Sequence, residues 1–251
     1  MKRIVQPELL DALPPDDPRA VRSRRDLCRV NAWMRHHAIM AEALQNQLNG
    51  CSGGRQTAAF LPEVGSSGSL PGAAASVLHI TDLGAGDGNL LLRVAQRISP
   101  RWPNVAVTLL DRQQIVSTQT LASLAVLGWR AETVAGDVFD WPQIPADVVV
   151  ANLFLHHFED TRLAGLFRAV AGGARLFVAM EPRRAPWPLF CSRLLWVIGC
   201  NAVTRHDATV SVRAGFSGNE LSALWPADGG WQLTERRTGL FSHLFVARRM
   251  N

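Results

Sequence analysis

The segment of residues 77–90 reads VLHITDLGAGDGNL and combines a short apolar run with three closely spaced glycines. The run Val77–Leu83 has the length of a buried strand, and Leu90–Ile98 has the apolar spacing of a helix. Glycines between a strand and a helix let the backbone approach a ligand closely, and the helix amino terminus offers unpaired N–H groups. We therefore expect a cofactor to bind at this strand–turn–helix junction.

Further apolar runs follow this strand and alternate with helical stretches. They are Val105–Leu110, Arg130–Val134, Asp147–Leu153 and Arg175–Met180. The alternation predicts an α/β fold with a doubly wound, mostly parallel sheet. Two late runs, Trp231–Arg236 and Ser242–Arg248, are separated by Thr238-Gly239 and are expected to close the sheet as an antiparallel pair.

Three regions are expected around and within this sheet domain. Residues 1–49 predict a helical amino-terminal extension, because Asp17-Pro18 is typical of a helix start and neither Pro nor Gly follows before Leu48. Residues 50–76 are rich in Gly and Ser, which indicates a linker. Residues 77–251 form the main domain, with a cap insertion at about 183–218 made of an apolar helix over Trp187–Val203 and an irregular stretch after Thr204. A short helix is expected near Asn219–Leu224.

Composition and charge argue against several classes of protein. With 251 residues, 47% of them hydrophobic and 19% charged, the chain is neither disordered nor fibrous. The net charge of +5 suggests an anionic partner, but Lys2 is the single lysine, and the arginines are scattered from Arg3 to Arg249. Because they form no contiguous tract, we predict no nucleic-acid partner.

Targeting and metal signals are weak. The most apolar stretch, Trp187–Val203, contains Arg193 and is shorter than the roughly 20 residues that a membrane-spanning helix needs, so no stable membrane insertion is expected. The segment Met1–Pro18 does not resemble a signal peptide. The cysteines follow no zinc, redox or disulfide spacing; they are Cys28, Cys51, Cys191 and Cys200. We expect a cytoplasmic protein with reduced thiols and no bound metal.

The spacing of the glycines narrows the choice of cofactor. Gly84, Gly86 and Gly88 give GxGxG, whereas the dinucleotide fingerprint is GxGxxG. The strand before them ends in Asp82, and an acid against the ligand suits a cationic amino group better than a pyrophosphate. This pattern disfavours an NAD-binding oxidoreductase.

The segment Asp82–Gly88 resembles motif I of the class I S-adenosylmethionine-dependent methyltransferases. Three later segments fall where that family has its motifs: Asp111 after the second strand, Gly136-Asp137-Val138 after the third, and Asp147–Phe158, which contains the Leu-His-His of many small-molecule members. The resemblance implies S-adenosylmethionine as the cofactor. It implies cofactor contacts from Asp82, Gly84, Ala85, Gly86, Gly88, Asp111, Arg112, Asp137, Val138, Asn152 and Leu153.

The resemblance also suggests roles for single residues, and each has a plainer alternative. Asp111 would accept hydrogen bonds from the ribose hydroxyls, or be a solvated acid at a strand end. Asp137 and the N–H of Val138 would contact the adenine, or Asp137 would cap a turn through its own backbone. Asp82 would face the methionine part of the cofactor, or orient the glycine loop. Asn152 would contribute mainly through its backbone.

Methylation of a phenol or enol oxygen needs a proton acceptor, and a histidine with a pKa near the working pH is suited to this task. The predicted order of preference is His206, then His157, then His243. His206 precedes Asp207, which is placed to orient it, while a structural role remains open for His156 and His157. Three others, His36, His37 and His79, are expected on a helix surface or in a strand.

Substrate contacts are predicted from both sides of the cap. The predicted residues are Trp33, Met34, His156, Glu181, Arg205 and Arg213. Together with Trp187 and Trp196, the first two would form an apolar wall for an aromatic or lipidic acceptor, although core packing explains any one of them. For Glu181 the alternative is a salt bridge to Arg183 or Arg184, and for the arginines a solvated surface.

The sequence therefore predicts a methyltransferase of secondary metabolism that acts on a small-molecule acceptor. The preferred target is an oxygen of an aromatic, polyketide or lipidic metabolite, and a homodimer is one expected assembly. Two alternatives stay open. The first is an RNA or protein methyltransferase whose basic surface binds the polymer. The second is a non-catalytic methyltransferase-like binding subunit.

Overall fold

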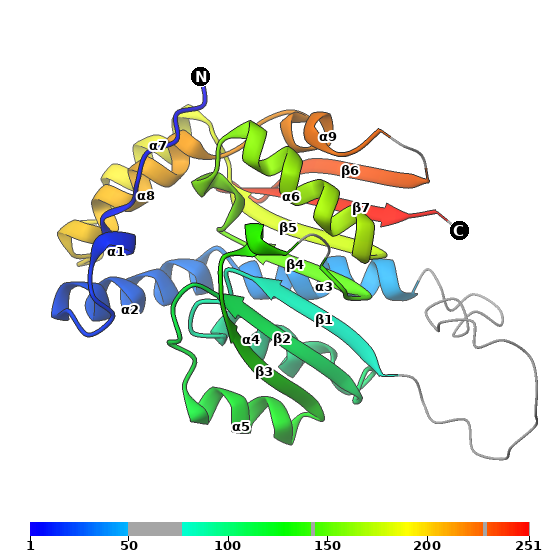
Figure 1. Cartoon of the computed structure of the whole chain (residues 1–251). Coiled ribbons are helices and arrows are strands. Elements are labelled where there is room, and N and C mark those ends of the chain that lie inside the picture. The colour runs from blue at the N-terminus through cyan, green and yellow to red at the C-terminus, as the bar shows by residue number, and fades with distance from the viewer. Residues whose placement is uncertain (50–76, 142–143, 228–229, 251) are drawn as a thin grey trace, which may run out of the picture.

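The computed structural model describes residues 1–49, 77–141, 144–227 and 230–250. The predicted linker at 50–76 lies outside the described residues. The strands are β1 (Leu78–Leu83), β2 (Val105–Asp111), β3 (Trp129–Ala135), β4 (Val148–Asn152), β5 (Leu176–Pro182), β6 (Trp231–Thr238) and β7 (Ser242–Arg249). In the described part of the chain they form one seven-stranded sheet of order β3-β2-β1-β4-β5-β7-β6 (Figure 1).

The pairing of the strands confirms the predicted fold class. Pairs among β1 to β5 are parallel, whereas β7 pairs antiparallel with both β5 and β6. The carboxyl ends of the parallel strands therefore lie together along one edge of the sheet, and open α/β sheets bind their ligands there. The antiparallel hairpin of β6 and β7 lies beside β5 and completes the sheet, as the sequence predicted.

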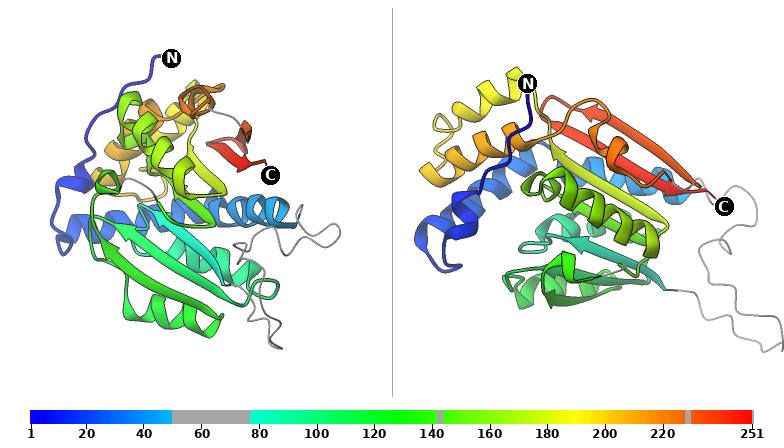
Figure 2. Two further views of the ribbon diagram at one scale, coloured as in Figure 1. Left: turned by 45° about the vertical axis from the view of Figure 1, so that its right-hand side comes forward. Right: turned by 45° about the horizontal axis from the view of Figure 1, so that its top comes forward.

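Helices cover both faces of the sheet and gather at one end of it (Figures 1 and 2). The α-helices are α1 (Leu9–Ala12), α2 (Pro18–Trp33), α3 (His36–Asn49), α4 (Asn89–Ile98), α5 (Thr118–Val126), α6 (Asp160–Gly173), α7 (Pro186–Arg193), α8 (Ala202–Ala214) and α9 (Glu220–Leu224). Short 3-10 helices follow β3 and β4, namely η2 (Val138–Asp140) and η3 (Leu155–His157). Figure 1 shows α1, α2, α7 and α8 together at the left.

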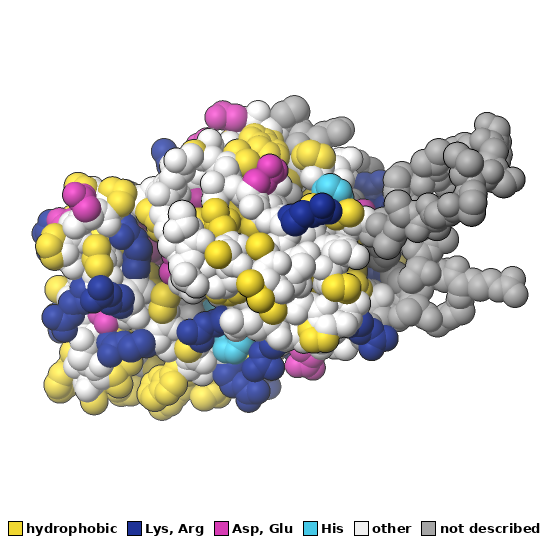
Figure 3. Space-filling model, turned by 90° about the horizontal axis from the view of Figure 1, so that it is seen from below, with side chains coloured by type: hydrophobic (Ala, Val, Ile, Leu, Met, Phe, Trp, Pro, Cys, Tyr) yellow, Lys and Arg dark blue, Asp and Glu magenta, His cyan; other side chains and the backbone are white. Residues whose placement is uncertain are grey.

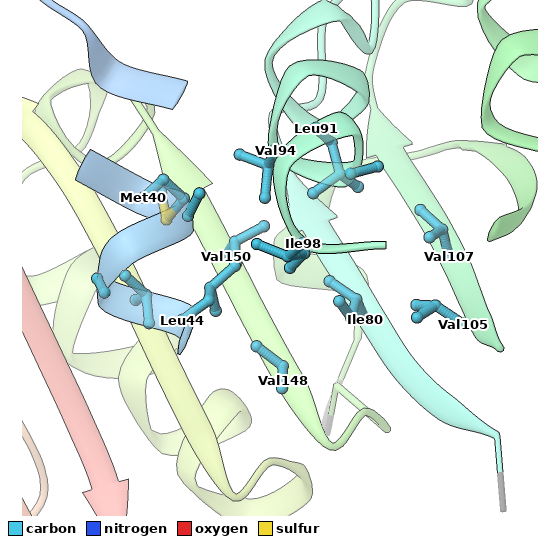
Figure 4. Packing of buried hydrophobic residues seen from close by; sticks show 14 of the residues in the cluster. Met40, Leu44, Ile80, Leu91, Val94, Ile98, Val105, Val107, Val148 and Val150 are labelled. Atoms are coloured by element: carbon cyan, nitrogen blue, oxygen red, sulfur yellow. The ribbon is translucent and has the colours of Figure 1, made fainter. Parts of the chain in front are cut away.

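The core has two layers because successive side chains of a strand point to opposite faces of the sheet. In β4, Val148 and Val150 pack under α3 and α4, while Val149 and Ala151 pack under α6. Figure 4 shows the first layer, in which Met40, Leu44, Leu91, Val94 and Ile98 of the two helices meet Ile80, Val105, Val107, Val148 and Val150 of the sheet.

Two predicted helical regions differ in detail from the structure. The amino-terminal region is broken between α2 and α3, where Arg35 takes a left-handed φ of +57°. The predicted cap helix over 187–203 is in fact two helices. Gly199, at φ +77°, ends the first segment, and the Asn201 side chain accepts a hydrogen bond from Thr204 N at 2.8 Å, which caps α8. Much of the stretch after Thr204 that was expected to be irregular is therefore helical.

The first twelve residues, here called the amino-terminal strap, lie against α8. Arg3 Nε donates to the carbonyl of Ala214 at 2.8 Å, and Ile4 N donates to that of Arg213 at 3.2 Å. The buried carboxylate of Asp207 accepts hydrogen bonds from the backbone N–H groups of Leu9 and Leu10, at 2.8 and 3.0 Å, and so caps the start of α1. The right-hand view of Figure 2 shows this dark-blue segment beside the yellow and orange α7 and α8.

Two glycines of α6 are expected to respond oppositely to alanine. A Cβ on Gly173 would lie 2.3 Å from the carbonyl oxygen of Ile144, whereas the nearest atom to a Cβ on Gly165 is Arg168 Nη2 at 3.9 Å. Gly165→Ala should raise the free energy of unfolding by up to about 1 kcal/mol through helix propensity. Gly173→Ala should lower it by about 1–3 kcal/mol through overpacking. Urea unfolding measures both values, and equal effects of the two substitutions would contradict the packing of α6 described here.

Candidate active site

A cavity of about 970 Å³ lies at the carboxyl ends of the parallel strands. The turns after β1, β2, β3 and β4 line it on one side, and α2, the start of α3, α7 and α8 line it on the other. Ten of the predicted cofactor residues line it: Asp82, Gly84, Ala85, Gly86, Asp111, Arg112, Asp137, Val138, Asn152 and Leu153. Gly88, which was predicted with them, lies outside the lining and occupies the N-cap position of α4.

The glycine loop after β1 presents backbone to the cavity. Gly84 and Gly86 have φ values of +69° and +56°, which side chains other than glycine rarely adopt. A Cβ on Gly84 would lie 2.3 Å from Cδ2 of Phe154, whereas a Cβ on Gly86 would meet no atom within 4 Å. Gly84 is therefore required by close packing, and Gly86 faces open space that a ligand can fill.

Two carboxyl groups stand beside this loop. Asp111 accepts hydrogen bonds from Gly86 N at 2.9 Å and from Gln113 N at 2.8 Å, which leaves lone pairs on both oxygens. Asp82 is 2% exposed and has no hydrogen-bond or ion-pair partner in the described part of the chain. Burial, with the charge of Asp111, raises the pKa of Asp82 to about 8. A buried carboxyl without a partner is suited to a cationic group of a ligand.

Asp137 combines two roles that the sequence left as alternatives. Its Oδ1 accepts a hydrogen bond from Phe139 N at 3.0 Å, so the side chain caps η2. Its Oδ2 lies 4.0 Å from Nη2 of Arg162. Asp137 and Val138 also line the cavity, so the cap leaves the carboxylate available to a ligand.

His36 was expected on a helix surface but is buried and lines the cavity. The left-handed turn at Arg35 starts α3 in a new direction and turns His36 inward, where its Nε2 lies 2.7 Å from Ser242 Oγ. Its Nδ1 and the Oδ1 of Asn152 are buried and form no hydrogen bond of normal geometry. Burial lowers the pKa of His36 to about 4, although the polar side chain of Asn152 beside it favours the protonated ring. The imidazole is therefore neutral at neutral pH.

His156 and Glu181 form a buried ion pair beneath the cavity. Glu181 accepts hydrogen bonds from the backbone N–H groups of Phe154 and Leu155, and His156 Nδ1 donates to its Oε2 at 2.7 Å. The second nitrogen of His156 lies 3.3 Å from Glu8 Oε1. Burial opposes a charge on His156, but its hydrogen bonds to the two carboxylates outweigh burial and raise its pKa to about 9. The pKa of Glu8 falls to about 2 although burial alone would raise it, because His156 and other partners favour the carboxylate.

Of the three histidines predicted as proton acceptors, His157 is the one that lines the cavity. Its Nδ1 lies 3.5 Å from Asp11 Oδ2. Burial and the neighbouring charge of His156 lower its pKa, although Glu8 and Asp11 oppose this shift. The imidazole of His157 is therefore unprotonated at neutral pH and can accept a proton.

The other two predicted proton acceptors do not line the cavity. His206 has about half of its side chain exposed, and its Nδ1 contacts Asp207 at 2.9 Å, whose carboxylate also caps α1. His243 is buried and bonded through Nε2 to Glu235 at 2.7 Å, which ties β7 to β6. Both histidines are therefore held in structural contacts.

Three of the six predicted substrate-binding residues lie outside the lining of the cavity. Trp33, Met34 and His156 line the cavity, whereas Glu181, Arg205 and Arg213 do not. Glu181 binds His156 and the backbone after β4, and neither of the salt bridges to arginine that the sequence suggested is present. Trp187 and Trp196 are 55% and 60% exposed and lie outside the lining.

Glu8, His156 and His157 form the one cluster in the described residues whose donor atoms, all within 4.8 Å of one another, could hold a metal ion. Both nitrogens of His156 are already next to carboxylates, and Ser211 Oγ donates to Glu8. An imidazolium between two carboxylates accounts for this arrangement, so we assign no metal to it. That the protein uses no metal stays a prediction.

Glu8, Asp11 and His36 are among the cavity-lining residues that sequence reasoning missed. The first two reach it because Asp207 and Ser211 of α8 hold the amino-terminal strap. No local pattern around residues 8–11 signals these contacts, which join positions about 200 residues apart. His36 depends on the turn at Arg35, where neither Gly nor Pro marks the break.

Comparison with known proteins supports the reading of the glycine loop. A methyltransferase domain family matches residues 80–173. An uncharacterized methyltransferase of Mycobacterium tuberculosis is 34% identical over 117 residues, which cover 44% of this chain and 56% of the relative, and one of Mycobacterium bovis matches equally. The chain thus spans little more than half the length of these curated relatives.

Two solved structures share the fold over most of the chain. The plantazolicin methyltransferase BpumL in complex with SAH has a TM-score of 0.59 and 11% identity, covering 93% of this chain and 91% of its own. An O-methyltransferase family protein from Burkholderia thailandensis has a TM-score of 0.53 and 17% identity, covering 94% and 61%. At these identities the likeness concerns the fold alone. Residues 80–173 thus match a methyltransferase domain, in agreement with the motif order, and membership of the whole chain in the class I S-adenosylmethionine-dependent methyltransferases stays a prediction.

The buried ion pair predicts a pH-dependent stability. The pKa of His156 is about 9 in the folded protein and about 6.5 when unfolded. Its contribution is therefore complete below pH 6.5, declines by at most about 1.4 kcal/mol per pH unit as the pH rises, and is lost above pH 9. His156→Gln should remove this slope and lower the free energy of unfolding at pH 6 by about 3 kcal/mol.

Urea unfolding of the two proteins at pH 6, 7, 8 and 9 measures the difference. His206→Gln is the matched control, because His206 is half exposed and lies outside the cavity. If the difference between the wild type and His156→Gln stays constant from pH 6 to 9, the ion pair does not hold His156 protonated.

Proposed function

We propose that the protein transfers a methyl group from S-adenosylmethionine to an oxygen of a small aromatic, polyketide or lipidic acceptor. The observation that carries the proposal is the unpartnered carboxyl of Asp82, buried beside Asp111 and a glycine loop that leaves room for a ligand. This arrangement suits a ligand that carries both an ammonium group and ribose hydroxyls.

The residues present fit this cofactor. Asp82 would bind the ammonium group, Asp111 the ribose hydroxyls, and Asp137 with the N–H of Val138 the adenine. S-adenosylmethionine, when bound, supplies a methyl group on a positively charged sulfur. The unpaired Oδ1 of Asn152 lies in the same cavity and offers a further acceptor for a polar group of a ligand.

His157 is the residue we assign to proton removal. Its contact with Asp11 through Nδ1 favours the tautomer that carries hydrogen there and leaves Nε2 free to accept a proton. The acceptor hydroxyl would give its proton to this nitrogen as the oxygen attacks the methyl group. Asp11 and Glu8 would then stabilise the imidazolium that forms, because both carboxylates favour the charged ring.

The size and walls of the cavity support a small-molecule acceptor. Its volume of about 970 Å³ is at the upper end of the usual range for ligand pockets. On the cap side it is lined by apolar side chains, among them Leu27, Leu195 and Val212. Helices α1, α2, α7 and α8 lie at this end of the sheet (Figure 1), and residues of each of them line the cavity. A cavity lined from both sides favours a small acceptor over a polymer.

The proposed cofactor site predicts that the affinity for the cofactor depends on pH. Below pH 8, Asp82 is protonated in the free protein, so binding of an ammonium group must release that proton. The dissociation constant of S-adenosylhomocysteine should therefore rise by up to tenfold per unit as the pH falls from 8 to 6. Calorimetry measures it, and Asp82→Asn should bind more weakly and lose this part of the pH dependence.

The control for that experiment is Asp87→Asn, since Asp87 also lines the cavity but already accepts hydrogen bonds from Asn89 at the start of α4. It separates a general effect of charge near the loop from the effect of the buried carboxyl. An unchanged pH dependence in Asp82→Asn would remove Asp82 from cofactor binding. Tight binding of NADH by the wild type, with none of S-adenosylhomocysteine, would favour the oxidoreductase that the glycine spacing argues against.

The proposed role of His157 predicts the effect of its substitution on the rate of methyl transfer. His157→Gln should lower kcat by about 10²- to 10⁴-fold with a phenolic acceptor, because a general base contributes that much. In the wild type, kcat/KM should fall at acidic pH with an apparent pKa below 6.5, since the pKa of His157 is lowered. His206→Gln should keep the wild-type rate. The rate at which S-adenosylhomocysteine forms from S-adenosylmethionine, with each of a panel of alkylphenols as the acceptor, measures these values.

The outcomes distinguish the remaining functions. A wild-type rate in His157→Gln would show that positioning alone accounts for catalysis. Methylation of RNA or protein, with steep dependence on salt, would support a polymer substrate. Cofactor binding without any methyl transfer would support a binding subunit.

None of the helices in the described residues has the length and apolar content that crossing a bilayer requires. A homodimer and a cytoplasmic location stay predictions.

A further inference from the structure

A group of large apolar side chains is exposed on α7 and on the turn that follows it. We call this group the apolar rim; its members are Trp187, Phe190, Leu194, Trp196, Val197 and Ile198. Within the described part of the chain, six of the fourteen exposed large hydrophobic side chains fall in these twelve consecutive residues. The rings of Trp187 and Phe190 stack with centroids 5.7 Å apart. Such a cluster marks a surface that meets another apolar phase.

The apolar rim is continuous with the candidate active site. Leu194, Val197 and Ile198 are exposed and also line the cavity, together with Pro188 and Leu195 of the same segment. The rim therefore lies at the margin of the cavity. An acceptor with a long alkyl chain can keep its chain against apolar side chains from the surface to the interior.

The segment that carries the rim is held at its base. Ser192 Oγ lies 3.2 Å from Thr209 Oγ1 of α8, and the N–H of Asn201 donates to the buried carboxylate of Asp26 in α2 at 2.8 Å. The side-chain amide of Asn201 also donates to the carbonyl of Arg19. The exposed side chains are thus presented from an anchored element.

The segment that carries the rim contains basic but no acidic side chains. No Asp or Glu occurs between Glu181 and Asp207, whereas Arg193 and Arg205 in that stretch are exposed. Across the interface with α2, Arg22 donates to the carbonyl of Gly199 at 3.2 Å. Figure 3, seen from below, shows Lys and Arg side chains, with some Asp and Glu, between hydrophobic ones at the left, which is the end that α1, α2, α7 and α8 form in Figure 1. Exposed tryptophans with arginines around them are typical of surfaces that bind anionic bilayers.

We propose that the apolar rim docks on the surface of an anionic lipid bilayer, and that an alkyl-chain acceptor passes from the bilayer into the cavity beside it. The second half of this inference rests on the proposed function, whereas bilayer docking does not. The arginines favour anionic headgroups, and the aromatic and aliphatic side chains favour insertion at the depth of the interface. A second copy of the chain seated on the rim would cover the margin of the cavity, so a bilayer is the occupant that keeps a supply of acceptor.

Flotation with vesicles tests the docking. The wild type should float with vesicles of phosphatidylcholine and phosphatidylglycerol, less with phosphatidylcholine alone, and less at high salt. Trp187→Ser with Trp196→Ser should weaken binding at least tenfold. The matched control is Val126→Ser with Leu233→Ser, which removes exposed apolar side chains from α5 and β6 and should bind as the wild type does.

Folding and cofactor binding separate this inference from the proposed function. Calorimetry with S-adenosylhomocysteine should give the same dissociation constant for the wild type and the rim variant, because Trp187 and Trp196 lie outside the cavity lining. With a long-chain alkylphenol in vesicles, the rim variant should show a raised KM. With a short-chain, water-soluble phenol it should show the wild-type kcat/KM.

Three results would overturn the inference. One is equal vesicle binding by the wild type and the rim variant. Another is a wild-type protein that ignores vesicles and forms a dimer that the rim substitutions dissociate in sedimentation experiments. The third is a wild-type protein that ignores vesicles but binds an acidic acyl carrier protein. Vesicle binding without methyl transfer to any acceptor would keep the docking surface and reject the proposed function instead.

Discussion

The buried carboxylate of Glu181 is the group on which the geometry of the site depends. It accepts hydrogen bonds from the backbone of Phe154, Leu155 and His156 and pairs with the imidazole of His156. An unpaired carboxylate at this depth would cost several kcal/mol, so the turn after β4 is held by the need to satisfy it. Because Glu181 belongs to β5 and the turn follows β4, the register of these two parallel strands fixes where His157 faces the cavity.

The acidic groups of the cavity form two sets with different electrostatics. Beside the glycine loop, Asp82 has the carboxylate of Asp111 as its charged neighbour, and no Arg, Lys or His among the described residues forms an ion pair with either group. Beneath the strap, Glu8 is compensated by the raised pKa, and hence the charge, of His156. The first set is therefore the part of the cavity with capacity for a cationic ligand, and the second keeps a neutral His157 beside a structural imidazolium. The two sets therefore differ in what each can accept: a cationic group beside the glycine loop, and a proton at His157.

The sequence predicted the sheet and the glycine loop well because both depend on local patterns. Alternation along β4 and the glycines after β1 show in a few consecutive residues. The proton acceptors were harder to predict, because which histidine lines the cavity depends on distant contacts. His206 looked promising beside Asp207, yet that carboxylate caps α1, and Glu8 approaches His156 through the same strap. His36 lines the cavity because of a left-handed turn that no Gly or Pro announces.

The cap helices divide their surfaces among three environments, and this division bears on acceptor choice. In α8, Asp207 and Ser211 hold the strap, while Ala208 and Val212 line the cavity. The turn after α7 has apolar side chains on both its cavity side and its exposed side. The opposite side of the cavity is built by the turns at the strand ends, which carry Asp82, Asp111 and Asp137. Selectivity for the acceptor can therefore change through the cap while the sheet edge stays the same, because the apolar side chains of the cap and the carboxyl groups of the strand ends belong to different elements.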